Sequence, residues 1–270
     1  MLDIDTKRAE KIIGQFIIHH VESAQFQGAV LGLSGGLDSS VVAALASRVL
    51  GSERVLGILM PYKFSSSEST EHANLIAKQL GIRTKTFDIT KIAEGYETNL
   101  DKLRLGNLLA RLRMCIVFDQ SKAESLIVLG TSNKTEFLLG YTTWYGDMAA
   151  GIYPIADFYK TQVRMLAKHL GIPQVIIDKP PTADLWPDQT DESEIGNSYE
   201  RIDKMLQLLV DGRLSPKETI QKGFSEQEVT RLTKMVIKNQ YKRVMPPICK
   251  ISARTIGYDF NYIKDWSTSL

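Results

Sequence analysis

Short apolar runs alternate with longer amphipathic or apolar segments through the first third of the chain. The runs 29–33, 54–60 and 82–89 have the length and composition of buried strands, and the segments 41–50 and 68–80 between them have those of helices. A β-α-β-α-β order requires parallel strands joined by right-handed crossovers. The pattern therefore predicts an α/β fold, a doubly wound parallel sheet with helices on both faces.

The rest of the chain extends this alternation. Further helices are predicted at 4–23, 90–100, 106–122, 157–170, 198–210 and 225–239, and a fourth strand at 125–130. Ligands of such sheets bind at the carboxyl ends of the strands. We therefore expect the polar residues that follow the strands 29–33 and 125–130 to share one ligand-binding edge.

Two stretches interrupt the periodic pattern. Residues 140–147 are aromatic and polar with glycine punctuation, which is typical of a functional loop. Residues 180–194 are acidic and contain three prolines. A connection of this length in a compact domain is usually a lid or a disordered loop, and Trp186 within it favours a lid.

Composition sets wider limits. A chain of 270 residues buries a full core, and one domain spanning 1–270 is the simplest division. The net charge of +2, with dispersed Lys and Arg, gives no indication of a nucleic-acid or membrane partner. Cys115 and Cys249 lack a CxxC spacing and are expected to be reduced, buried thiols. Without a signal-peptide layout or a bilayer-length apolar run, a cytoplasmic location is expected.

The turn after the first predicted strand, residues 32–40, carries the strongest chemical signal. Gly35 and Gly36 are expected to allow positive φ and a close approach of ligand to backbone. The turn also opens a helix, whose free amides and dipole favour an anion such as phosphate. A carboxylate beside bound phosphates is tolerated when a cation bridges them, so Asp38 predicts Mg²⁺.

This turn matches neither the Walker A loop nor G-x-G-x-x-G, because it lacks Gly-Lys-Ser/Thr and the three spaced glycines. A plain strand-to-helix turn with Asp38 as helix cap is the alternative without function. The pattern Ser-Gly-Gly-x-Asp-Ser resembles the pyrophosphate loop of the ATP pyrophosphatases. That resemblance implies cleavage of ATP between its α and β phosphates.

Later stretches narrow the resemblance to the NAD synthetase family. They occur in the family's order at 130–136, 140–141, 145–147, 159–163, 181–185 and 190–196. The resemblance implies a Rossmann-like fold of the adenine nucleotide alpha hydrolase type. It also implies ATP-dependent amidation of deamido-NAD with ammonia, through an adenylated carboxylate, to give NAD, AMP and pyrophosphate.

The resemblance is to the ammonia-dependent form of the family. Glutamine-dependent members carry an N-terminal amidase domain, and this chain begins only one helix before the pyrophosphate loop. Members of the ammonia-dependent form are homodimers with deamido-NAD near the subunit interface, so a homodimer is expected.

The family's functional residues carry over to matching positions. The ATP-binding set is Gly32, Leu33, Ser34, Gly35, Gly36, Leu37, Asp38, Ser39, Thr131, Lys160 and Thr182. Asp38 and Glu136 would bind Mg²⁺. Lys160 would neutralise charge on the departing pyrophosphate, although a lysine at a helix start is solvated in most proteins.

Arg113 matches the family's deamido-NAD arginine, a side chain that suits phosphate or carboxylate groups. Asp147 completes the predicted catalytic set with Asp38 and Lys160. It is expected to bind or deprotonate ammonium, or to hold a second metal.

Three positions in the expected deamido-NAD site depart from the family's common residues. Trp144, Gly151 and Tyr241 stand where many members have lysine, aspartate and histidine, whereas Lys242 matches. All three concern the substrate rather than ATP. Aromatic rings at 144 and 241 are hypothesised to replace charged contacts by stacking on nicotinate or ribose.

Two other classes of function compete. Another ATP pyrophosphatase, similar to GMP synthetase or to a tRNA-modifying enzyme, would carry an amidotransferase domain or a basic RNA-binding surface. An ATP-sensing module without turnover would be favoured if Asp38, Glu136 or Lys160 were missing, and all three are present.

The stacking hypothesis gives a test. Trp144→Ala should raise the KM for deamido-NAD and leave the KM for ATP nearly unchanged, because only the substrate loses a ring contact. Steady-state kinetics with each substrate varied in turn would measure both constants, and equal effects on the two would contradict the hypothesis.

Overall fold

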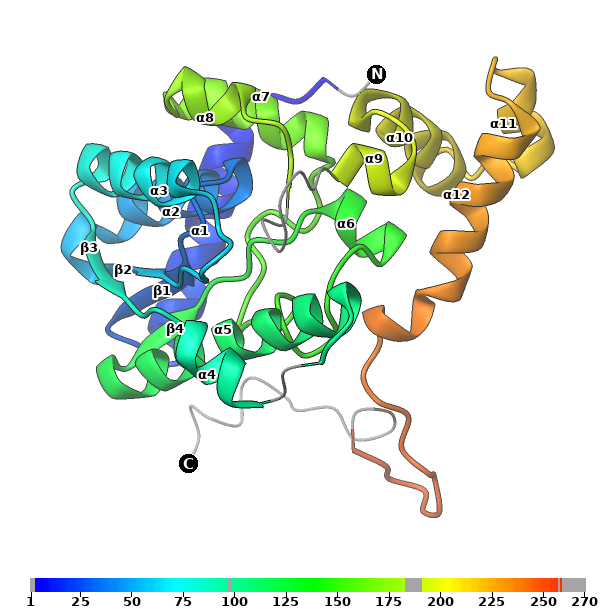
Figure 1. The fold of residues 1–270 in the computed structure, drawn as a ribbon. Coiled ribbons are helices and arrows are strands. Elements are labelled where there is room, and N and C mark those ends of the chain that lie inside the picture. The colour runs from blue at the N-terminus through cyan, green and yellow to red at the C-terminus, as the bar shows by residue number, and fades with distance from the viewer. Residues whose placement is uncertain (1–2, 97–98, 183–190, 257, 259–270) are drawn as a thin grey trace.

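The structure is a computed structural model that describes residues 3–96, 99–182, 191–256 and 258. Its centre is one parallel sheet of β1 (Gly28–Gly32), β2 (Val55–Leu59), β3 (Arg83–Thr86) and β4 (Leu126–Val128). The strand order is β3-β2-β1-β4 (Figure 1). The chain steps outward from β1 to β3 and then returns to the other side of β1. The carboxyl ends of the neighbouring strands β1 and β4 therefore mark the topological switch point, which is where sheets of this kind bind ligands.

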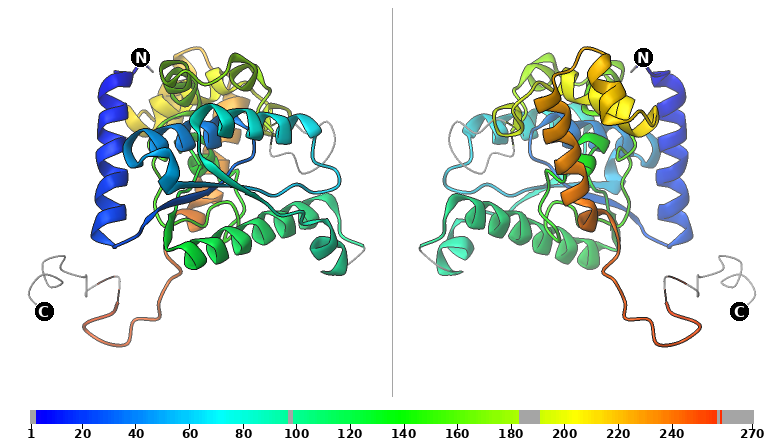
Figure 2. Two further views of the ribbon diagram at one scale, coloured as in Figure 1. Left: turned by 90° about the vertical axis from the view of Figure 1, so that its left-hand side faces the viewer. Right: turned by 90° about the vertical axis from the view of Figure 1, so that its right-hand side faces the viewer.

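Helices cover both faces of the sheet, which confirms the predicted α/β class (Figure 2). One face carries α1 (Thr6–Ser23), α2 (Leu37–Leu50), α3 (Ser67–Leu80), α7 (Lys160–Leu170) and α8 (Gln174–Asp178). The other face carries α4 (Thr90–Tyr96) and α5 (Lys102–Glu124). Successive residues of β1 point to opposite faces, so Leu31 packs with the first group and Val30 packs with α5.

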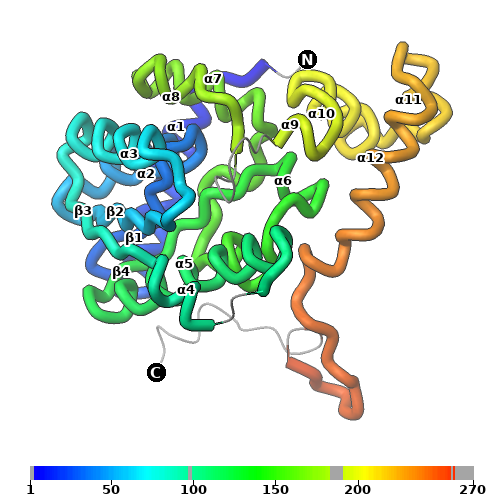
Figure 3. Tube along the Cα trace, in the orientation of Figure 1, coloured from blue at the N-terminus to red at the C-terminus, as the bar shows by residue number. Residues whose placement is uncertain are grey.

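A second, smaller helical layer with its own apolar core packs beside α7 (Figures 1 and 3). It consists of α6 (Lys134–Leu139), α9 (Asp191–Ile195), α10 (Tyr199–Leu206), η2 (Gln207–Asp211), α11 (Pro216–Gln221), α12 (Glu226–Lys238) and η3 (Gln240–Arg243). Its core includes the fully buried Tyr199 and Ile202. Beyond η3 the chain leaves this layer and projects from the body.

Most predicted elements are present, with different ends. The helix predicted at 41–50 begins at Leu37, the strand predicted at 82–89 shrinks to β3, and the long helix predicted at 198–210 continues beyond α10 as η2. The pattern missed the short elements α6, α8, α9, α11, η1 (Ser52–Arg54) and η3, which are too short to show periodicity, and α9 begins inside the stretch 180–194 that was predicted to be a loop. The lid predicted around Trp186 lies outside the described residues.

Two local expectations were wrong. Gly36 has φ −87° and is the N-cap of α2, so only Gly35 of the pair uses positive φ. Cys115, in α5, and Cys249, which follows η3, are free thiols, but both are exposed rather than buried. Within the described residues, the helices are all too short or too polar to cross a membrane.

Gly35 is the position at which the pyrophosphate loop requires glycine. Its φ is +75°, and a Cβ there would lie 2.1 Å from the Ser69 carbonyl oxygen of α3. The absence of a side chain therefore lets the loop pack directly against the backbone of α3.

Gly35→Ala should destabilise the fold far more than Gly171→Ala. Gly171 has φ +73° but no described atom within 4 Å of an added Cβ, so its substitution costs about 1 kcal/mol of backbone strain. The clash at Gly35 adds about 1–3 kcal/mol. Urea unfolding of both variants measures the difference, and equal losses would show that contact with α3 does not constrain the loop.

Candidate active site

A cavity of about 330 Å³ opens at the carboxyl edge of the sheet, at the switch point between β1 and β4. This volume is at the lower end of the range for small-molecule sites. The predicted site residues that line it are Gly32, Leu33, Ser34, Gly36, Leu37, Asp38, Ser39, Arg113, Thr131, Glu136, Asp147, Lys160 and Thr182. The structure thus brings together parts of the chain that are up to 150 residues apart.

The pyrophosphate loop is organised by its own serines. Ser34 Oγ lies 3.1 Å from Ser39 Oγ and accepts a hydrogen bond from Gly36 N at 3.2 Å. Ser39 and Ser40 both donate their hydroxyls to the Gly36 carbonyl oxygen. The first turn of α2 leaves its amides pointing out of the helix, and Gly36 places no side chain over them. This arrangement suits a phosphate group.

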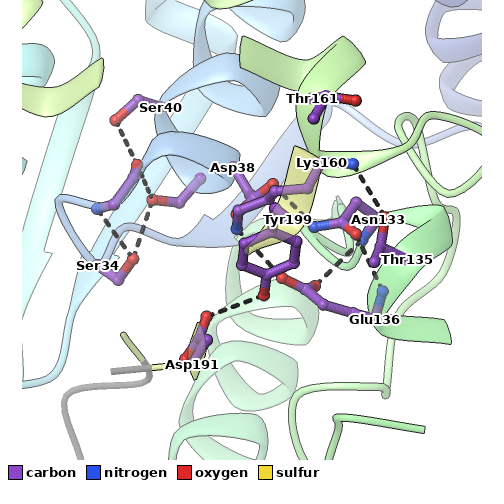
Figure 4. A network of polar contacts seen from close by, with 12 residues as sticks. Ser34, Asp38, Ser40, Asn133, Thr135, Glu136, Lys160, Thr161, Asp191 and Tyr199 are labelled. Carbon is purple, nitrogen blue, oxygen red and sulfur yellow. Dashed lines mark hydrogen bonds and ion pairs between the residues drawn. The ribbon is translucent and has the colours of Figure 1, made fainter. Parts of the chain in front are cut away.

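The ammonium of Lys160 is the centre of the site (Figure 4). The residue is 4% exposed, and its Nζ forms ion pairs with Asp38 Oδ2 and, at 3.3 Å, with Glu136 Oε1. The same Nζ lies 5.3 Å from the centre of the Tyr199 ring. A cation–π contact and two carboxylates therefore hold a buried positive charge at the first residue of α7.

Carboxylates outnumber ammonium groups in this cluster. Burial alone would lower the pKa of Lys160, but Asp38, Glu136 and Asp191 outweigh that effect and raise it. Burial raises the pKa of Glu136 to about 8, with Lys160 opposing the shift and the charges of Asp38 and Asp191 adding to it. Lys160 is therefore protonated and faces more carboxyl groups than it can pair with, and Glu136 keeps its proton up to about pH 8 while no cation is bound.

Asn133, to which no role was given from the sequence, positions both predicted metal ligands. It is fully buried, and its Nδ2 donates to Asp38 Oδ1 at 3.1 Å. Its Oδ1 accepts from Glu136 N while Glu136 Oε2 accepts from Asn133 N, which forms a capping box at the start of α6. The Ser-Asn-Lys-Thr-Glu spacing is itself a capping-box signal that indicates this role.

Asp203, also without a predicted role, anchors the segment that carries Lys160. Its carboxylate is fully buried and accepts from Thr135 Oγ1 at 2.6 Å and from Thr161 N and Oγ1 at 2.8 Å. Lys160 N in turn donates to Thr135 Oγ1 at 3.0 Å. α6, α7 and α10 are thereby joined behind the site.

The donor set suits Mg²⁺ together with phosphates. Asp38 and Glu136 supply hard carboxylate oxygens next to a phosphate-binding loop. Among the described residues there is no group of three or more His, Cys, Asp or Glu that could hold a metal alone. Mg²⁺ is usually bound by one or two carboxylates plus substrate phosphates, so this arrangement fits the ion.

Arg113 and Asp147 line the side of the cavity formed by α5 and the loop 140–147. Arg113 Nε donates to the Met60 carbonyl oxygen at 3.3 Å. Asp147 Oδ1 accepts from Thr143 N. The surrounding protein raises the pKa of Asp147 to about 6, against the effect of that hydrogen bond, while part of the side chain stays open to solvent. Asp147 is ionised at neutral pH.

The positions that depart from the family, and Lys242, lie outside the cavity lining. Trp144 stacks on Tyr145, with ring centres 4.6 Å apart, and meets Tyr241 edge to face at 5.3 Å. Lys242 Nζ donates to the carbonyl oxygens of Gly140 and Thr142, both at 2.7 Å. The aromatic residues at 144 and 241 thus contact each other, and Lys242 fixes the adjoining loop.

Gly151 lies beside the end of β4 in space, where its amide donates to the Val128 carbonyl oxygen at 2.9 Å. A Cβ there would lie 2.9 Å from Ile127 Cγ1 and 3.2 Å from the Val128 oxygen. An aspartate at this position would therefore require the surrounding atoms to shift.

Comparison with known proteins gives one consistent result. The family model for NAD synthase matches residues 10–246. The chain is 47% identical over 268 residues to the NH3-dependent NAD+ synthetase of a strain of Chlorobium phaeobacteroides, covering 98% of this chain and 97% of that protein. It is 43% identical over 253 residues to the protein of that name from Fusobacterium nucleatum, covering 93% and 98%.

Two solved structures share the fold of this chain and carry different names. The NH3-dependent NAD synthetase of Campylobacter jejuni superposes with a TM-score of 0.79 at 33% identity, covering 92% of this chain and all of that one. NMN synthetase of Francisella tularensis superposes with a TM-score of 0.82 at 29% identity, with the same coverage.

Removing the Lys160 charge should destabilise the fold strongly. Lys160→Met leaves buried carboxylates without their ammonium, at a cost of about 3–5 kcal/mol. Lys134→Met is the control, because Lys134 pairs with Asp157 and Asp211, which are exposed, and its loss should cost about 1 kcal/mol or less. Urea unfolding measures both, and similar small losses would contradict the charge balance described for the cluster.

Proposed function

The chain belongs to the NAD synthase family, and we propose that it amidates deamido-NAD with ammonia at the expense of ATP, giving NAD, AMP and pyrophosphate. One observation carries this proposal: the pyrophosphate loop and the buried Lys160 cluster share one cavity at the switch point of the sheet. The family match does not favour an enzyme similar to GMP synthetase or a tRNA-modifying enzyme.

The ATP half of the reaction is assigned to the loop and to Lys160. The amides and hydroxyls of residues 32–39 bind the phosphates, and Thr131 and Thr182 line the same cavity. When the carboxylate of deamido-NAD attacks the α phosphate, negative charge moves to the departing pyrophosphate. A buried, fixed ammonium stabilises that charge without reorganising, which is the largest kind of effect available to such a step.

Asp38 and Glu136 are the proposed Mg²⁺ ligands. Bound there with the phosphates, the ion would neutralise phosphate charge and orient the triphosphate. Asn133 holds both carboxylates without the ion, because its Nδ2 donates to Asp38 Oδ1 and its backbone N donates to Glu136 Oε2.

The deamido-NAD half is assigned to Arg113, Asp147 and the loop that carries Trp144. Arg113 supplies a planar cation for a phosphate or carboxylate of the dinucleotide. Asp147, ionised at neutral pH, is proposed as a proton acceptor in the ammonia step. Trp144 and Tyr241, in mutual contact, are proposed to border the bound substrate as one aromatic surface, and Lys242 and Gly151 are proposed as further substrate contacts.

We also propose a homodimer located in the cytoplasm. The projecting segment 244–256 exposes Val244, Met245, Ile248 and Ile251, with 47%, 80%, 46% and 93% of their surface accessible. Exposed apolar side chains gathered in this way mark protein interfaces. A second copy of this chain is the proposed partner.

The reaction is tested by its product balance. Purified protein with ATP, Mg²⁺, deamido-NAD and ammonium should release AMP and NAD together, and omission of deamido-NAD should abolish AMP release. Chromatography of the nucleotides measures both products. If the protein binds ATP but deamido-NAD elicits no AMP, a different carboxylate is the substrate, and the replacements at 144, 151 and 241 become the first place to look.

A further inference from the structure

Asp191 presents a carboxylate oxygen that its surroundings do not satisfy. It is the first residue of α9, is 5% exposed and lines the cavity. Its Oδ2 accepts from the Tyr199 hydroxyl at 3.1 Å, whereas its Oδ1 has no hydrogen-bond partner among the described residues (Figure 4). A buried charged acceptor left unpaired is costly, so a site of this kind is built for a ligand.

The tyrosine hydroxyls near Asp191 Oδ1 already donate their protons to other oxygens, so toward a ligand they can only accept hydrogen bonds. The hydroxyl of Tyr199 donates its proton to Asp191, and that of Tyr141 donates its proton to Glu194 Oε2 at 2.6 Å. Tyr141 lines the same cavity, and its hydroxyl is near enough to Asp191 to lower the pKa of that carboxyl group. Each hydroxyl has a single proton, so its remaining lone pairs only accept. A ligand here must donate hydrogen bonds.

The charge of the surrounding groups further limits which ligand can bind. Lys160 directs its ion pairs to Asp38 and Glu136, which leaves Asp191 as an excess negative charge in the cluster. The field therefore favours a cation. Mg²⁺ prefers carboxylates and phosphates, whereas two phenolic hydroxyls and one carboxylate suit a small ion with N–H donors on every side.

We infer that Asp191, with the hydroxyl oxygens of Tyr141 and Tyr199, binds the ammonium ion that the reaction consumes. The inference rests on the proposed function and gives its second substrate a location. Asp147 keeps the separate role of proton acceptor. Its Oδ1 accepts from the amide of Thr143, which fixes the orientation of the carboxyl group. Binding at Asp191 would hold the ion beside the phosphate-binding residues, where the adenylated carboxylate forms.

The first test varies ammonium at saturating ATP and deamido-NAD. Asp191→Asn should raise the KM for ammonium by about tenfold to a hundredfold, since it removes a charged acceptor. ATP–pyrophosphate exchange, measured with deamido-NAD but without ammonium, reports the first half-reaction, and its KM for ATP should change by a smaller factor than the KM for ammonium. Glu192→Gln is the matched control, because Glu192 is the next acid in α9, accepts from Tyr199 N and does not line the cavity. It should leave the KM for ammonium unchanged.

The second test identifies the species that binds. Below the pKa of ammonium, a site for the ion gives a KM for total ammonium that does not change with pH. A site for neutral ammonia gives a KM that falls about tenfold per pH unit. Wild type should show the constant value between about pH 6.5 and 7.5, below the pKa of Glu136, which is about 8.

Several outcomes overturn the inference. These are an unchanged KM for ammonium in Asp191→Asn, a rise confined to Asp147→Asn, or a KM in wild type that falls with pH. If Asp191→Asn fails to fold, Tyr141→Phe replaces it, and an unchanged KM for ammonium in that variant is equally decisive. Failure of the wild type to form NAD at all would instead reject the proposed function.

Discussion

One buried ammonium connects the parts of this molecule. Lys160, at the start of α7, pairs with Asp38 from the pyrophosphate loop and with Glu136 from α6, and it rests on the ring of Tyr199 from α10. Desolvating such a charge costs several kcal/mol unless carboxylates and hydrogen bonds compensate. The compensation comes from both layers of the fold, so the sheet and the helical layer must dock correctly for the charge to be satisfied.

The same cluster explains why the cavity suits cations. Three carboxylates surround one ammonium, and burial raises the pKa of Glu136 to about 8. Mg²⁺ with phosphates at Asp38 and Glu136, and ammonium at Asp191, would each relieve part of the excess charge. Triphosphate brings its own negative charge, so under the proposed function its binding would be tied to the arrival of the cation.

The sequence predicts which residues of the proposed ATP side gather at one edge of the sheet, for a physical reason. Strand, glycine turn and helix start are local features, and parallel strands bring the residues that follow β1 and β4 to one edge. Asp38, Glu136 and Lys160 could therefore be assigned from motifs, and the structure places them in direct contact.

Contacts that depend on long-range packing could not be predicted. The Tyr199 ring under Lys160, the link from Tyr199 to Asp191 and the contact of Trp144 with Tyr241 each join helices or loops whose relative placement no local pattern encodes. The prediction that Cys115 is buried was wrong for a related reason. Apolar neighbours in the sequence do not say which side of α5 faces the sheet. Short helices such as α6 and α11 are fixed by capping boxes rather than by periodicity.

The most direct test of the charge balance is calorimetry of ATP binding with and without Mg²⁺, on wild type and on Glu136→Gln. An excess of carboxylates around Lys160 predicts that Mg²⁺ strengthens ATP binding to wild type by at least about tenfold, and that removing the Glu136 charge abolishes most of this gain while leaving binding without Mg²⁺ equal or tighter. The same gain from Mg²⁺ in both proteins would contradict the account, because the cation would then be held by ATP alone.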